Sequence, residues 1–209
     1  PNVAKSWQIS DDATMYTFQL RKGMKWSDGE EFTADDIVFW WTYVESNKDI
    51  QSKPRGYMVV KGEQATVKAV DKHTVQFSWS NPNGLWLENL ASPYGVSVAQ
   101  FAEHYHRQFI KGLNPDGVAK LMAADGSTDY TQWWNTIVGS YGKQSEYNNP
   151  ARPSVHGWIP KEPFLGKEQF KFERNPYYFK VDKACTQLPY IDYRQWVLAA
   201  DTEIQLAKS

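Results

Sequence analysis

The sequence predicts a mixed α/β fold, because strand-like segments are interleaved with segments of helical periodicity. Apolar and polar residues alternate over Tyr16–Leu20 and Gln169–Arg174, as expected for half-buried strands. Phe101, Tyr105 and Phe109 lie one helical turn apart in the region between these strands. Hydrophobic residues make up 41% and charged residues 22% of the chain, which is ordinary for a soluble globular protein.

A strand, a turn and a capped helix follow one another between residues 16 and 41. The turn is Trp26-Ser27-Asp28-Gly29, where Gly29 can take a positive φ and Asp28 can accept hydrogen bonds from nearby backbone N–H groups. Thr33 is placed to cap the helix, and Asp36 can reach back to the Thr33 N–H as in a capping box. We therefore interpret Trp26, Asp28, Gly29, Thr33 and Asp36 as structural residues of this unit.

The other expected elements follow in chain order. A short strand around Trp7 and Ile9 pairs with Tyr16–Leu20, and Ala65–Val70 forms a second hairpin with His73–Trp79. Further segments carry helical patterns, the first with an extended alternative: Leu85–Leu90, Val98–Ile110, Pro115–Ala124 and Tyr130–Val138. An irregular connection rich in Pro and Gly covers residues 140–167, and the last strand is expected over Ile191–Leu198.

Aromatic residues are unusually frequent, at 15% with 10 Trp. Such a content suits stacking on sugar rings, but aromatic side chains also dominate the packing of ordinary cores, which is the interpretation that we favour. Matched periodicity in adjacent segments predicts a core that joins sheet to helix, formed by Trp7, Tyr16, Phe18, Leu20, Ile37, Trp40, Trp41, Val67, Val75 and Phe77.

Several function classes find no support in the residues. The formal net charge is −1, so nothing indicates nucleic acid or an anionic membrane surface as a partner. Cys185 is the only cysteine, which excludes an internal disulfide and a cysteine-based metal cluster. His104 and His106 are two residues apart on an expected helix and point about 200° apart, so we expect solvent-facing or capping roles rather than a metal site.

The chain also has no recognisable catalytic motif. Nucleophile elbows, zinc-protease helices, phosphate-binding loops and dinucleotide fingerprints are all missing from the sequence. The adjacent carboxylate pairs, such as Asp35 and Asp36, diverge and are explained by turns or helix starts. We therefore expect a protein that is not an enzyme and that needs no cofactor or metal.

The strand–turn–helix unit closely resembles the motif of the family 5 extracellular solute-binding proteins, in the form YTFQLRKGMKWSDGEEFTADDIVFWW. Segments at residues 1–12, 67–77, 172–179 and 188–192 are similar to the family's flanking segments. The resemblance implies a periplasmic-binding-protein-like fold of type II, the three-part cluster C type, in which two lobes close on a ligand. It also implies the substrate-binding component of an ABC importer, which captures a peptide or similar solute and delivers it to a membrane permease.

The resemblance further implies where solute is bound and where the protein resides. In related receptors a loop after the first helix presents an aromatic residue, sometimes with an arginine, and Arg55 and Tyr57 are the nearest matches. Tyr94, in a second loop, is the third ligand-binding candidate. The competing interpretation for all three is an exposed polar loop. The implied location is periplasmic or extracellular, with a lipid anchor as an alternative, and no signal segment is present in the sequence.

Family members are much longer than 209 residues, so the resemblance predicts a fragment from the first half of such a protein. About residues 1–155 would form an accessory subdomain with a helical excursion, and about residues 156–209 a return segment of the first lobe. Residues 201–209 begin a capped helical pattern. Because the last strand would carry exposed apolar residues, we also expect self-association of such a fragment.

Two alternatives for the function remain open at the level of sequence. An oligosaccharide receptor of the same family is one of them, because the tryptophan content suits stacking on sugars. A protein of a different class, a glycan-binding module or an inactive glycosidase fragment, is the other. That second alternative requires two facing carboxylates or an exposed row of tryptophans, and the sequence has neither at identifiable positions.

Overall fold

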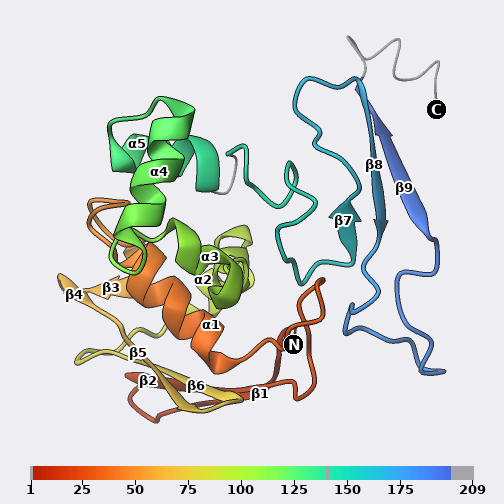
Figure 1. Cartoon of the computed structure of the whole chain (residues 1–209). Helices are drawn as coiled ribbons and strands as arrows, with labels where there is room; N and C mark the ends of the chain where they lie inside the picture. Colours follow the sequence, from red (N-terminus) through yellow and green to blue (C-terminus); the bar gives the residue numbers. More distant parts are fainter. Residues whose placement is uncertain (1, 140–141, 199–209) are drawn as a thin grey trace.

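The computed structural model describes residues 2–139 and 142–198, with the side chain of Tyr94 left out. Its first part is an antiparallel sheet in the order β1-β2-β6-β5 (Figure 1). The strands are β1 Ala4–Ile9, β2 Met15–Leu20, β5 Thr66–Asp71 and β6 Thr74–Ser78. Both predicted hairpins are therefore confirmed.

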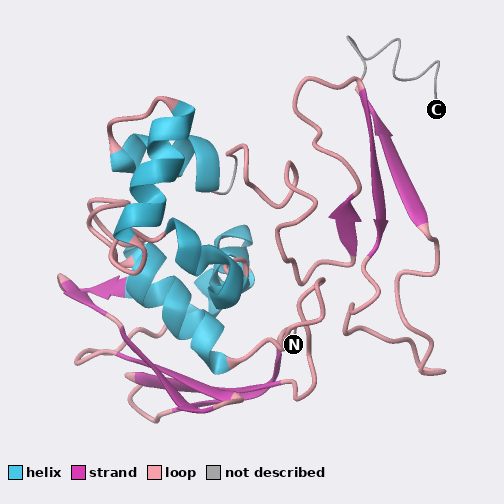
Figure 2. Ribbon diagram, viewed as in Figure 1, coloured by secondary structure: helices cyan, strands magenta, loops and turns pink. Residues whose placement is uncertain are grey.

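Helices cover one face of this sheet, and none covers the other face in Figure 2. Helix α1, Ala34–Phe39, continues without a break into a π-helical segment, η1, Trp40–Glu45. Thr33 caps α1, and the capping box with Asp36 is present as predicted. Ile37, Trp40 and Trp41 are all buried, and α1 packs against β5 and β6 as well as against the helical segments of residues 93–99 and 103–106, which explains the all-round apolar pattern.

The other helical segments and a small hairpin complete this part. The short elements that follow η1 are η2 Gly56–Met58, β3 Val59–Val60, β4 Glu63–Gln64, α2 Trp86–Ala91 and η3 Pro93–Ala99. Beyond them lie α3 Glu103–His106, η4 Arg107–Phe109, α4 Pro115–Asp125, α5 Tyr130–Trp133 and η5 Trp134–Val138. In the described ranges, no helix has both the length and the apolar character that a membrane span requires.

A second antiparallel sheet, in the order β7-β8-β9, lies to one side of the helices (Figure 1). Its strands are β7 Trp158–Pro160, β8 Gln169–Arg174 and β9 Tyr193–Val197. The last strand is shorter than the predicted Ile191–Leu198, and all five of its residues are exposed. The helical pattern predicted for residues 201–209 lies outside the described residues.

Two residues of the predicted core are placed differently. Trp7 is 40% exposed, because it lies on the edge strand β1 and lines an open cavity. Val67 is only partly buried and packs against the core from β5, at the opposite edge. The remaining predicted core residues are buried, and they are joined by residues that the periodicity did not single out, above all Trp26 and Trp86.

The single helix predicted over Val98–Ile110 is wrong. The chain instead forms η3, an extended step at Ala102, and then the short helices α3 and η4. The expectation that His106 faces solvent or caps a helix is also wrong. Its ring is fully buried between Phe101, Tyr105 and Phe109. The break before Glu103 redirects the following turn toward the core, and a continuous helix would not have done so.

Replacing Thr33 with alanine is expected to lower the free energy of unfolding by about 1 kcal/mol. The Thr33 hydroxyl accepts the Asp35 N–H at 3.3 Å, and alanine would leave that donor without its partner. Urea unfolding of the variant measures the loss. Solute affinity of the complete receptor should not change, and a large loss of affinity at normal stability would contradict the capping role.

Candidate functional site

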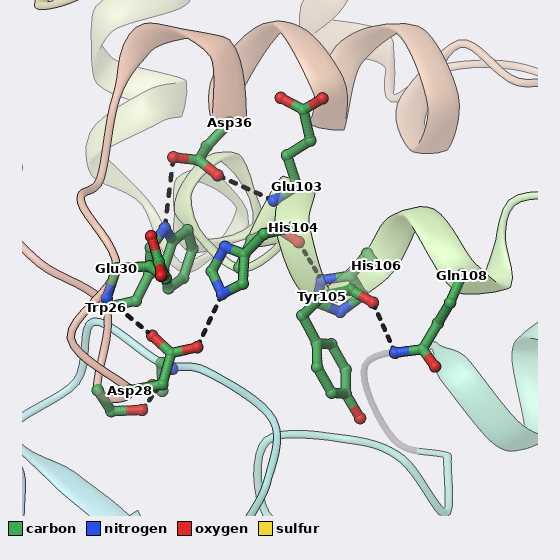
Figure 3. A network of polar contacts seen from close by, with 12 residues as sticks. Trp26, Asp28, Glu30, Asp36, Glu103, His104, Tyr105, His106 and Gln108 are labelled. Atoms are coloured by element: carbon green, nitrogen blue, oxygen red, sulfur yellow. Dashed lines mark hydrogen bonds and ion pairs between the residues drawn. The ribbon is translucent and has the colours of Figure 1, made fainter. Parts of the chain in front are cut away.

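The turn that follows β2 is tied to the helices by a buried carboxylate (Figure 3). Asp36 accepts hydrogen bonds from the backbone N–H groups of Thr33 and Glu103, both at 2.9 Å, and from Trp26 Nε1 at 3.3 Å. Burial raises the pKa of Asp36, and these hydrogen bonds oppose that effect. The side chain thus joins the turn, the start of α1 and the start of α3, segments that are up to 67 residues apart.

Asp28 and Gly29 make the outer contacts of the same turn. Asp28 Oδ1 accepts the Glu30 N–H at 3.2 Å, as expected for a turn aspartate, and His104 Nε2 donates to Asp28 Oδ2 at 2.7 Å (Figure 3). Gly29 has a φ of 95°, and a Cβ at this position would lie 3.2 Å from the ring of Tyr177. A side chain here would therefore be strained and would press on that ring.

The turn also holds the chain that leads into the second sheet. The Ser27 N–H donates to the Ser154 carbonyl at 2.9 Å, and the Ser154 N–H donates to Ser27 Oγ at 3.0 Å. Asn175, which is fully buried, donates to the Ser154 carbonyl at 3.3 Å and to the His156 carbonyl at 2.8 Å. The motif residues thus connect the first sheet, the helices and the β7–β9 sheet.

Arg55, a predicted ligand-binding residue, is held by a carboxylate that the sequence analysis did not single out. Glu45 Oε1 accepts the Arg55 backbone N–H at 2.7 Å, and Glu45 Oε2 lies 3.2 Å from Arg55 Nη1. The same Nη1 donates to Ser97 Oγ on η3. The Arg55 side chain is 36% exposed, whereas that of Glu45 is 2% exposed.

The other two predicted ligand-binding residues lie close to these segments. Tyr57 is partly buried in η2, and its carbonyl accepts a hydrogen bond from Asn83 Nδ2 at 3.0 Å. The backbone of Tyr94 belongs to η3, and its side chain lies outside the described part of the structure. Because Arg55 reaches Ser97, the structure brings the loop before η2 and the segment η3 together.

A cavity of about 840 Å³ lies elsewhere. Its walls are the end of the first sheet near Trp7 and Leu20, the exposed side of α2 and η3, and the residues Tyr178 and Phe179. Neither Arg55 nor Tyr57 lines it. The cavity is mainly apolar, and His156 is among its few polar residues.

His156 is paired with a buried glutamate. Its Nε2 lies 3.4 Å from Glu146 Oε2, and Glu146 also accepts a hydrogen bond from Gln100 Nε2 at 3.0 Å. The hydrogen bond with Glu146 raises the pKa of His156. Burial acts to raise the pKa of Glu146, but the pairing with His156 and the charge of Arg152 outweigh it and lower that pKa. Within residues 2–139 and 142–198, no group of three or more His, Cys, Asp or Glu side chains could hold a metal ion.

Comparison with known proteins identifies the family. The family model described as bacterial extracellular solute-binding proteins, family 5 Middle, matches residues 1–208. The chain belongs to the family 5 extracellular solute-binding proteins. A solved structure of an oligopeptide-binding protein OppA is similar over 100% of this chain and 31% of that chain, with a TM-score of 0.85 and 35% sequence identity. The observed fold is therefore part of the fold of the OppA-type periplasmic binding proteins.

Two curated members of this solute-binding family are similar in sequence. A periplasmic alpha-galactoside-binding protein of Rhizobium meliloti is 31% identical over 98% of this chain and 27% of its own length. A dipeptide-binding protein of Escherichia coli is 36% identical over 70% of this chain and 30% of its own length. The chain thus spans less than a third of these relatives. The family consists of binding proteins that act outside the cytoplasm rather than of enzymes.

A pH dependence follows from the His156–Glu146 pair. Because the folded-state pKa of His156 is raised above the ordinary value of 6.5, the pair stabilises the fold fully below pH 6.5. That contribution is lost as the pH rises through the folded-state pKa. Glu146 and the fully buried His106 have lowered pKa values. Their contributions to stability are therefore fully present at high pH, and they are lost as the pH falls below 4.5 and 6.5 respectively.

From about pH 6 to about pH 9, wild type should lose at most about 1 kcal/mol of unfolding free energy relative to His156→Gln, because His156 is partly exposed. The change at His106, which has the opposite sign in this interval, is the same in both proteins. Urea titrations of both proteins at the two pH values measure this difference. Equal slopes in wild type and variant would show that the pair contributes nothing to stability.

Proposed function

We propose that the receptor carrying this chain captures a solute outside the cytoplasmic membrane and delivers it to the permease of an ABC importer, without chemical change. Family membership over residues 1–208 supports this role. A periplasmic or extracellular location, with a lipid anchor as one way of retaining the receptor there, belongs to the same proposal. So does the division into an accessory subdomain, about residues 1–155, and a return segment of the first lobe.

The proposed solute is a peptide. The observation that carries this choice is the likeness to the oligopeptide-binding protein OppA over the whole chain, at a TM-score of 0.85. A second candidate is an α-galactoside, because the alpha-galactoside-binding relative matches 98% of the chain at 31% identity. Both solutes suit a loop surface with an aromatic residue and hydrogen-bond donors.

Calorimetry of the complete receptor decides between the two solutes. Titration with a pool of short peptides should give saturable heat, and titration with an oligosaccharide pool that contains α-galactosides should give none. Saturation by the oligosaccharide pool alone would replace peptide with galactoside as the solute. Turnover of either solute, abolished by a single substitution, would contradict the assignment as a binding protein.

We further propose Arg55, Tyr57 and Tyr94 as solute contacts of this chain. Arg55 is partly exposed, and the loop that carries it lies against η3, which contains Tyr94. Among the described residues, the Nε and Nη2 groups of Arg55 have no hydrogen-bond partner, so three N–H donors remain for a solute.

The chain by itself should bind solute only weakly and should self-associate. A cleft receptor encloses its ligand between two lobes, and this chain corresponds to less than a third of its relatives' length, so affinity in the millimolar range or weaker is expected, about −4 kcal/mol. Strand β9 is an edge strand of the described sheet, with Trp196 43% and Leu198 66% exposed. Peptide titration and light scattering test this, and micromolar binding by a monomer would contradict it.

A further inference from the structure

Glu45 is a buried carboxylate in an unfavourable position. It is the last residue of the π-helical segment η1, where the helix dipole disfavours negative charge, and it is 2% exposed. A buried charge destabilises a protein unless it is paired and hydrogen-bonded. π-helical segments are rare, and they occur frequently at functional sites. The burial of the Glu45 carboxylate at the end of η1 is therefore explained only by the groups with which it pairs.

The partners of Glu45 show what it holds. Both of its carboxylate oxygens contact one residue, Arg55: Oε1 accepts the backbone N–H at 2.7 Å, and Oε2 forms an ion pair with Nη1 at 3.2 Å. Gln51 Nε2 donates to the Glu45 carbonyl and closes the intervening loop from a second side. Both the backbone and the guanidinium of Arg55 are thus fixed relative to the end of η1.

The guanidinium in turn joins a second segment. Arg55 Nη1 also donates to Ser97 Oγ in η3, 42 residues further along the chain. Ser97 is buried, whereas the Arg55 side chain is 36% exposed. The chain Glu45–Arg55–Ser97 therefore unites the loop of residues 46–57 and η3 in one surface.

The pairing also changes the electrostatic character of Arg55. An anionic group that approached its outer N–H donors would be attracted by the guanidinium and repelled by the nearby Glu45 carboxylate, so the two effects largely cancel. An uncharged acceptor, such as a peptide carbonyl or a sugar hydroxyl, needs only the oriented N–H donors and is hardly affected.

We infer that Glu45 is a positioning residue of the solute site: it holds Arg55 against Ser97 and cancels its charge, so that this surface selects an uncharged hydrogen-bond acceptor. The inference rests on the proposed function, since it takes Arg55 as a solute contact. Glu45 itself touches no solute.

The first test uses the complete receptor and a set of peptides in which one glutamine at a time is replaced by glutamate. In wild type, Arg55 should give no preference for glutamate at any position. In Glu45→Gln, which keeps an acceptor oxygen but removes the charge, one position should gain about five- to tenfold in affinity for glutamate over glutamine. Arg55→Gln in the Glu45→Gln background should abolish this gain. A merely structural role of Glu45 would lower affinity for all the peptides alike.

The matched control is Glu168→Gln, which removes the same charge from an exposed position before β8. It should leave every glutamate-to-glutamine affinity ratio unchanged. The inference is overturned if no ratio changes in Glu45→Gln, or if wild type already prefers glutamate through Arg55. A receptor that binds neither peptides nor galactosides would refute the proposed function, and with it the selectivity part of this inference.

A second measurement tests the positioning role without any solute. Hydrogen exchange of the backbone amides is compared in wild type, Glu45→Gln, Ser97→Ala and Glu168→Gln. In Glu45→Gln and in Ser97→Ala, exchange should become faster in residues 55–57 and 93–99 together. In Glu168→Gln it should remain as in wild type. Faster exchange confined to residues 55–57 in Glu45→Gln would show that the two segments are not coupled.

Discussion

Replacing Trp86 with alanine is expected to lower the free energy of unfolding by about 3–5 kcal/mol. The ring of Trp86 is fully buried, and its centroid lies 4.6 Å from that of Phe77 and 4.8 Å from that of Tyr16. It joins α2 to the inner face of the first sheet, so truncation leaves a large cavity where several aromatic rings meet. Urea unfolding followed by circular dichroism measures the loss.

Trp7→Ala is the matched control, because it removes the same type of side chain from an edge strand of the sheet on which Trp86 packs. Trp7 is 40% exposed on the edge strand β1, so its loss should cost only about 1 kcal/mol. Comparable losses for Trp7→Ala and Trp86→Ala would mean that β1 is covered in solution and that the distinction between edge and core is wrong.

Replacing Asp36 with alanine is expected to cost about 3 kcal/mol or more, because three N–H donors lose their shared acceptor. These donors belong to Thr33, Glu103 and Trp26, so the start of α1, the start of α3 and the turn are loosened together. Urea unfolding measures the stability, and hydrogen exchange at the Glu103 amide reports the local effect.

Asp35→Ala is the control for charge and helix position. Asp35 precedes Asp36 in the first turn of α1 but is exposed, so its replacement removes only a favourable interaction with the helix dipole, about 0.3–1 kcal/mol. If Asp35→Ala and Asp36→Ala were equally destabilising, the stabilisation by Asp36 would be a matter of charge at the helix start and not of the buried network.

The features that could be predicted from the sequence are those that neighbouring residues determine. The strand patterns of Tyr16–Leu20 and Gln169–Arg174, the cap at Thr33 and the helical segment Pro115–Ala124 were predictable. Each depends on residues only a few positions apart, whose spacing is visible in the chain. The family resemblance rests on the same kind of local signal, concentrated in the strand–turn–helix unit.

Whether a side chain is buried was predictable only where the apolar periodicity of its segment coincides with the packing of other elements over it. Trp7 pairs with the buried Phe18, yet it is exposed, because it lies on the edge strand β1 and lines an open cavity. His106 has polar neighbours in sequence and is nevertheless fully buried, because the extended step at Ala102 redirects the turn that carries it.

The candidate site divides in the same way. Sequence alone determined the strand–turn–helix unit and the family, since these depend on local patterns. The family resemblance then indicated the loop residues Arg55 and Tyr57 as candidates. Tertiary structure decided that Glu45 is buried beneath Arg55 and that Ser97 meets the same guanidinium. A glutamate at the end of a helix and a serine in a loop carry no signal of their own, because their pairing exists only once segments 42 residues apart have packed together.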